Sequence, residues 1–72
     1  MSKYKKIILE VLDTEKIKST NQVLKEVEKK TGKVINWHAL YRVLMELTIE
    51  GKVEKFQADA GFFWRRTQHL DY

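Results

Sequence analysis

The sequence predicts one small α+β domain, in which three helices are followed by a β-hairpin. Apolar residues recur at helical spacing in three separate segments. Capping residues and glycines mark the ends of these segments, and a short C-terminal stretch rich in aromatic residues is interrupted by a turn. The chain has 72 residues, which suffices for one domain and not for two, so we expect residues 1–72 to form a single unit.

The first helix is expected between Lys3 and Asp13. Its apolar side chains follow the spacing i, i+3, i+4, i+7 and i+8, which places them on one stripe: Tyr4, Ile7, Ile8, Val11 and Leu12. Ile17 then stands alone between two lysines in a polar connector. A residue in this setting suits a very short strand, which could pair with the edge of the later hairpin.

The second helix is expected to open at Ser19, because Ser19 and Gln22 have the spacing of a capping box. Gly32 is expected to end it, since glycine readily adopts the positive φ of a helix C-terminus. Val34 and Ile35, in the connector that follows, are expected to fill the gap between the second and third helices. The buried face of the second helix should consist of Val23, Leu24 and Val27.

Asn36 is a favourable N-cap for a third helix, which should end at Gly51. Its buried direction is set by an aliphatic stripe: Leu40, Leu44 and Leu47, with Val43 beside them. An advance of about 100° per residue directs a second group to the opposite face. This outer group consists of His38, Arg42, Met45 and Ile49, while Trp37 and Tyr41 lie on one flank.

Two strands are expected from Val53 to Gln57 and from Phe62 to Thr67, joined by a short turn that ends in glycine. The strands carry more aromatic residues than a two-stranded ribbon can expose, so most of these should pack against the helices: Phe56, Phe62, Phe63 and Trp64. The resulting order of helix, short strand, helix, helix and hairpin is that of a winged helix-turn-helix.

Residues Ala39 to Val53, ALYRVLMELTIEGKV, resemble the recognition-helix segment of winged helix-turn-helix proteins. The segment is especially similar to the DNA-binding half of ferric uptake regulators, in which a Tyr-Arg pair precedes alternating core residues and a terminal glycine. Those regulators carry their metals mainly in a second, dimerisation domain, which has no counterpart in these 72 residues. The resemblance therefore implies DNA binding without that metal site.

The Z-DNA-binding winged helices have a similar layout, which this sequence matches with Gly51-Lys52-Val53 and Trp64. Their reader helix carries Asn and Tyr where this sequence has Tyr41 and Met45. Recognition of left-handed DNA is therefore not expected.

A side chain that reaches a base edge must lie on the outer face of the third helix, near its N-terminus. Arg42 could contact guanine or a phosphate, and Tyr41 a phosphate or a thymine methyl. Tyr41 and Trp37 could equally pack against the core. Three cations of the hairpin could neutralise phosphates. The candidate DNA-binding set is Trp37, His38, Tyr41, Arg42, Lys55, Arg65 and Arg66.

The net charge of +4 agrees with a polyanion partner, although a solvated lysine-rich surface would give the same charge. We expect sequence-specific binding of double-stranded DNA by a small transcriptional regulator. A homodimer is expected, because one such domain covers too little DNA for high specificity. Met45 and Ile49 are either ordinary surface residues or a self-association contact, to which Leu70 or Tyr72 of another copy could contribute. The alternative function is a protein–protein interaction adaptor in a larger assembly.

Several other classes of function are not expected. The chain has no cysteine, and its two histidines, His38 and His69, lack an acid–histidine pair at ligand spacing, so we expect no metal or other cofactor. No serine has a base partner and no glycine-rich phosphate loop occurs, so an enzyme is not expected. The N-terminus does not resemble a secretion signal, and no apolar run approaches the roughly 20 residues that span a bilayer. These features favour a soluble, cytoplasmic protein without a membrane partner or an evident small-molecule ligand.

Overall fold

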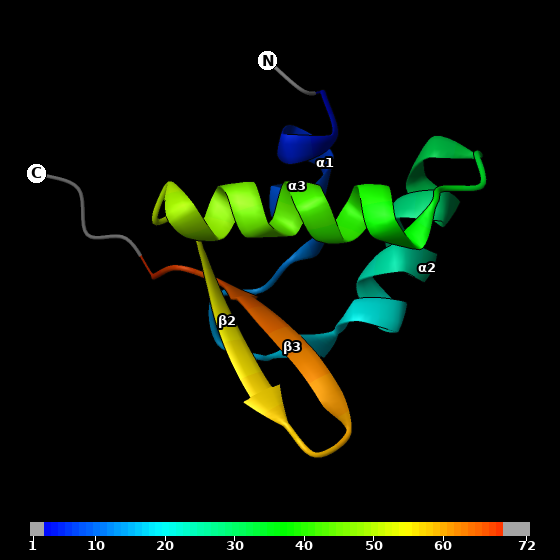
Figure 1. Ribbon diagram of the computed structural model, residues 1–72. Coiled ribbons are helices and arrows are strands. Elements are labelled where there is room, and N and C mark those ends of the chain that lie inside the picture. The colour runs from blue at the N-terminus through cyan, green and yellow to red at the C-terminus, as the bar shows by residue number, and fades with distance from the viewer. Residues whose placement is uncertain (1–2, 69–72) are drawn as a thin grey trace, which may run out of the picture.

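The computed structural model describes residues 3–68 and consists of three helices and a three-stranded sheet (Figure 1). The elements follow one another in the predicted winged-helix order, which confirms the predicted fold class. Their bounds are α1 (Lys3–Val11), β1 (Lys18–Ser19), α2 (Thr20–Thr31), α3 (Trp37–Ile49), β2 (Val53–Ala58) and β3 (Gly61–Arg66).

The sheet is antiparallel, with the strand order β1-β3-β2. The short strand expected around Ile17 begins one residue later, at Lys18, and pairs with the edge of β3 as predicted, with Lys18 opposite Trp64. In the hairpin, Val53 pairs with Arg66 and Ala58 with Gly61, so the turn is shorter than the four residues expected. The β2–β3 hairpin extends away from the helices as the wing (Figure 1).

The predicted caps fix the ends of α2 and α3. Ser19 Oγ accepts a hydrogen bond of 3.1 Å from the Gln22 backbone N–H. Gly32 ends α2 with a φ of 71°, a conformation that favours glycine. Asn36 Oδ1 accepts from the backbone N–H groups of two residues in the first turn of α3, at 2.8 and 3.1 Å. The Asn36 cap fixes the residue at which α3 begins.

The core lies between the helices and the inner face of the sheet. It contains Trp64, whose indole Nε1 donates a 2.7 Å hydrogen bond to Thr20 Oγ1. Thr20 Oγ1 in turn donates to the Phe62 carbonyl at 3.2 Å. Among the residues described, no buried side-chain nitrogen or oxygen lacks a partner. The buried apolar residues are Ile8, Leu12, Val23, Val27, Leu40, Leu44, Leu47, Val53 and Trp64.

Two expectations about apolar residues differ from the structure. Val34 is 94% exposed, so it does not fill the gap between α2 and α3, whereas Ile35 packs against the core. Because successive residues of a strand point to opposite faces, the four aromatic residues of the hairpin do not all lie on the same face of the sheet. Phe62 and Trp64 face the helices, while Phe56 and Phe63 pair across the hairpin on the other face of the sheet. The expectation that most of the four pack inward is therefore wrong for two of them.

Candidate nucleic-acid interface

The N-terminal half of α3 presents the polar residues that the sequence predicts for its outer face. His38 and Arg42 are exposed, whereas the leucine stripe on the opposite side is buried. Within the described chain, no carboxylate lies within ion-pair distance of His38 or Arg42. Both side chains are therefore available to an external partner.

Trp37 and Tyr41 form an aromatic cluster on the flank of α3. Their rings are stacked with centroids 5.2 Å apart, and Trp37 also meets the His38 ring edge-on at 5.3 Å. Tyr41 is half-buried and continues the contacts inward, with ring centroids 5.7 Å from Phe62 and 5.8 Å from Trp64. Tyr41 thus packs between helix and wing, while Trp37 remains 37% exposed.

Lys55 lies where the wing meets this aromatic cluster. Its Nζ donates a 3.3 Å hydrogen bond to the Tyr41 hydroxyl and sits 4.2 Å from the centre of the Phe62 ring. A cation over a ring face is attracted by the ring quadrupole, which orients the ammonium group. No ion pair to Lys55 occurs within residues 3–68. The structure therefore brings Lys55 next to Tyr41 of α3, a proximity that the sequence alone did not reveal.

The paired arginines lie on opposite faces of β3. Arg65 donates to Glu54 Oε1 through Nε at 2.9 Å and through Nη2, and its guanidinium is 5.1 Å from the Phe56 ring centre. Arg66 is turned toward α1, where Nη1 donates to the Leu9 carbonyl at 3.1 Å. Arg66 is thus separated from Arg65, and it lies at the base of the wing.

The two apolar residues predicted for the outer face of α3 have different surroundings. Ile49 is 82% exposed, as the helical spacing predicts. Met45 is half-buried, and its side chain packs against the buried core residues. Only Ile49 therefore offers a fully accessible apolar surface. Leu70 and Tyr72, named above as contributors to a contact, lie outside the described residues.

Several lysines of the first half are engaged within the fold. Lys18 Nζ donates to the Val11 carbonyl at 2.5 Å and to Glu26 Oε1 at 2.7 Å. The hydrogen bond from Lys18 lowers the pKa of Glu26 below its usual range. Lys5 pairs with Glu50 across α1 and α3. These lysines contribute to tertiary structure rather than to a free cationic surface.

Neither a metal site nor a membrane span is found in the described residues. No group of three His, Cys, Asp or Glu side chains within residues 3–68 could hold a metal ion. His69 lies outside that part of the chain. No helix there is long and apolar enough to cross a bilayer.

The three helices, the short strand and the hairpin that follows the third helix define a winged-helix protein. Two solved structures share this fold, the complex structures of hsRosR-S4 and hsRosR-S1, and RosR is a winged-helix transcription regulator. Each superposes with a TM-score of 0.83 over 94% of this chain, with sequence identities of 29% and 28%. The match covers 59% and 61% of the two RosR chains, so this chain spans about three-fifths of their length. No protein-family model and no curated protein sequence matches it.

Proposed function

We propose that the protein binds double-stranded DNA sequence-specifically and acts as a transcription regulator. The observation that carries the proposal is the cationic surface formed by α3 and the wing. Exposed His38 and Arg42 occupy the outer face of α3, and Lys55 of β2, which has no carboxylate partner in the described chain, contacts Tyr41 on the flank of the same helix. The similarity to RosR supports the same function, as does the resemblance of residues 39–53 to the ferric uptake regulators.

In the proposed complex, the N-terminal half of α3 enters the major groove. Arg42 has the planar pair of donors that matches the acceptors of guanine, and His38, one turn earlier, reaches a neighbouring base or phosphate. Trp37 contacts the sugar–phosphate backbone at the groove edge. Tyr41 holds Lys55 in position to neutralise a phosphate. Arg65, on the other face of the wing, would exchange its ion pair with Glu54 for a phosphate.

We propose a homodimer as the DNA-binding unit, because two copies would read two half-sites and increase specificity. Ile49 is the apolar residue on α3 that is free to contribute to such a contact. We infer no cofactor and no catalytic step for this function.

The direct test is binding to duplex DNA of random sequence at different salt concentrations. Binding should be measurable by fluorescence anisotropy at about 50 mM salt and should weaken steeply by about 200 mM, because each neutralised phosphate releases counterions. Lys6→Gln, which removes an exposed charge from α1, serves as the control for net charge alone. Absence of binding at low salt would contradict the proposal.

A protein–protein adaptor is the second candidate function. The observation in its favour is the outer face of the sheet, where Phe56 and Phe63 are not packed against the core. An adaptor would show little DNA binding at either salt concentration. The same titration therefore separates the two functions.

Arg42 provides the test of sequence reading. Arg42→Ala should weaken binding to a selected site by about 1–3 kcal/mol and relax the base preference at one position. The preference is measured by selection from a random library, with Arg42→Lys as a variant that keeps the charge but not the paired donors. Equal weakening on every sequence would assign Arg42 to a phosphate instead.

A further inference from the structure

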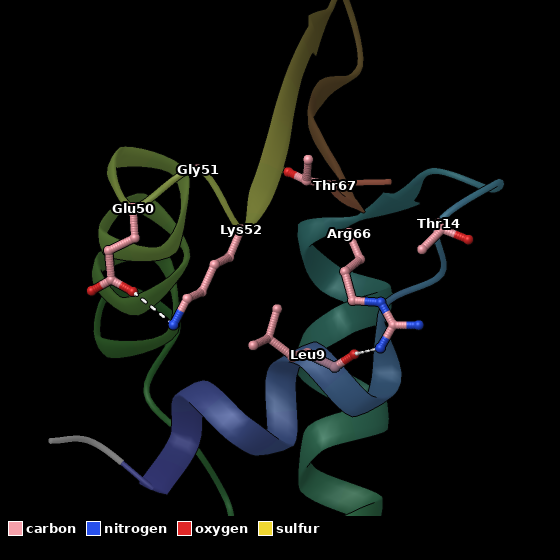
Figure 2. Close-up of a pocket in the computed structure, with 7 residues that line it drawn as sticks. All are labelled: Leu9, Thr14, Glu50, Gly51, Lys52, Arg66 and Thr67. Atoms are coloured by element: carbon pink, nitrogen blue, oxygen red, sulfur yellow. Dashed lines mark hydrogen bonds and ion pairs between the residues drawn. The ribbon is translucent and has the colours of Figure 1, made fainter. Parts of the chain in front are cut away.

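A pocket of about 460 Å³ opens between α1, the end of α3 and the base of the wing (Figure 2). Leu9 of α1 forms its apolar wall, and the turn after α3 contributes the segment 50–52. Arg66 and Thr67 line it from the end of β3, and Thr14 from the connector after α1. Its size falls in the range of sites that hold small molecules.

Two cationic side chains, Lys52 and Arg66, line this pocket. Lys52 and Arg66 extend from the base of the wing toward α1 on either side of Leu9 (Figure 2). Arg66 uses one N–H of its guanidinium, at Nη1, for the Leu9 carbonyl, and no carboxylate of the described chain pairs with it. A guanidinium has five N–H donors, so Arg66 retains donors for another acceptor.

The carboxylate in the pocket wall, Glu50, pairs with two lysines, Lys5 and Lys52. Glu50 receives a hydrogen bond from Lys5 through Oε2, and this bond lowers the pKa of Glu50. Lys52 Nζ forms a longer ion pair, of 3.8 Å, with the other oxygen, Oε1, and this distance exceeds that of a hydrogen bond (Figure 2). The Lys52 side chain is 60% exposed. Lys52 is therefore weakly held by Glu50 and can bind a competing anion.

We propose that this pocket binds a small organic anion, whose phosphate or carboxylate group is held between Lys52 and Arg66 and whose short apolar part contacts Leu9. Hydrogen bonds from charged donors such as these two side chains are stronger than those from neutral groups, and Leu9 supplies the apolar wall beside them. The site is distinct from the α3 surface proposed for DNA, and it adds a ligand to a fold for which the sequence predicts none.

Because the pocket lies where α3 and the wing meet, a bound ligand would affect the stability of the fold. The Thr67 N–H donates to the Lys52 carbonyl, and the Lys52 N–H donates to the Leu47 carbonyl, at 2.9 Å each. The residues that hold the anion are thus attached both to the end of α3 and to the base of the wing. An anion bound between Lys52 and Arg66 would fix these elements relative to α1 and stabilise the folded chain by mass action.

The test uses the full chain without DNA, so its result does not depend on the proposed DNA binding. Potassium phosphate and potassium succinate are titrated separately at constant ionic strength maintained with KCl. Amide chemical shifts should change saturably at Thr14, at residues 50–52 and at Thr67. A stronger response to phosphate would identify a phosphoryl ligand, and a stronger response to succinate a carboxylate; equal responses would also support an oxyanion site.

Three variants and a control determine whether the measured anion binding takes place in this pocket. Lys52→Gln and Arg66→Gln should each weaken the titrated affinity about ten-fold, because each removes a charged donor. Glu50→Gln should strengthen it, since the competing carboxylate is lost. Lys29→Gln, on the exposed surface of α2, should leave it unchanged.

Two results would overturn the proposal. One is the absence of saturable shifts with either anion up to roughly 10 mM, a concentration that detects even weak binding. The other is an equal loss of affinity in Lys29→Gln, which would show general attraction to a basic surface. Because Lys52 is largely exposed, Lys52→Gln is expected to fold even if Arg66→Gln is destabilised.

Discussion

Arg65 and Arg66 are adjacent in sequence, yet their side chains have different surroundings because successive residues of a strand point to opposite faces. Arg65 lies with Glu54 and Phe56 on the face away from the helices. Arg66 is turned toward α1 and the pocket. The sequence suggested a common phosphate-binding role for both. The register of the hairpin separates them, and only Arg65 belongs to the DNA surface that we propose.

This separation leads to opposite expectations for two single substitutions. Arg65→Gln should flatten the log–log salt dependence of DNA binding by about one unit, because one fewer phosphate is neutralised. Arg66→Gln should leave that slope unchanged and lower the thermal unfolding midpoint, since it removes a contact between β3 and α1. The slope is measured by anisotropy and the midpoint by circular dichroism. If the salt dependence of DNA binding were flatter in Arg66→Gln and unchanged in Arg65→Gln, Arg66 would be the residue that contacts a phosphate.

Among the elements, α3 shows most directly how a local signal fixes the start of a helix. Asn36 satisfies two backbone N–H groups that would otherwise lack partners at the start of the helix. Asn36→Ala should therefore lower the free energy of unfolding by about 1 kcal/mol. Asn36→Ser keeps a side-chain acceptor, so it should lower the free energy of unfolding much less. Urea denaturation provides the measurement, with exposed Asn21→Ala of α2 as the control. A cost in Asn21→Ala equal to that in Asn36→Ala would argue against the cap.

The contact between α1 and the end of α3 has a pH dependence that follows mainly from the Lys5–Glu50 ion pair, beside which Glu46 lies 3.7 Å from Lys5 Nζ. The hydrogen bond from Lys5 holds the pKa of Glu50 below its usual value of 4.5, and Glu50 raises the pKa of Lys5 above 10.5. The pair therefore stabilises the fold fully between these two values. Its contribution is lost as pH falls through the lowered Glu50 pKa, or as pH rises through the raised Lys5 pKa.

Glu50→Gln removes this titration and tests the assignment. The difference in unfolding free energy between the parent and Glu50→Gln should stay constant across neutral pH and shrink below pH 4.5. Both values come from urea denaturation at a series of pH values, with exposed Glu15→Gln as the control. A difference that persists at acid pH would mean that Glu50 acts through packing rather than through charge.

The elements were predictable from the sequence where the signal is local. Ser19, Gly32 and Asn36 each act through residues within a few positions, and the leucine stripe of α3 follows from helical spacing alone. The environments that depend on other elements were not predictable. Met45 packs against core residues from other elements. Lys55 contacts Tyr41 only when the wing is packed against α3. The pocket is formed by residues from α1, the connector after it, the turn after α3 and the end of β3.

At the scale of the whole molecule, the proposed specific DNA binding requires more contact area than one winged-helix unit provides. The chain spans about three-fifths of the RosR chains that it resembles, and 72 residues provide a limited core. The proposed homodimer would supply a second reader helix. Ile49 could contribute to it, because its side chain is apolar and 82% exposed.

A single substitution on α3 tests this role without disturbing the core. Ile49→Lys should convert dimers to monomers in sedimentation equilibrium while the helical circular dichroism signal is retained, because a buried lysine would oppose the contact. Met45 is unsuitable for this purpose, since it packs against the core. Ile17→Lys, at a residue 49% exposed beside β1, is the matched control on another face. Monomers in Ile17→Lys alone would instead place the contact between copies beside β1. An unchanged mass in both variants would show that neither face forms the contact between copies.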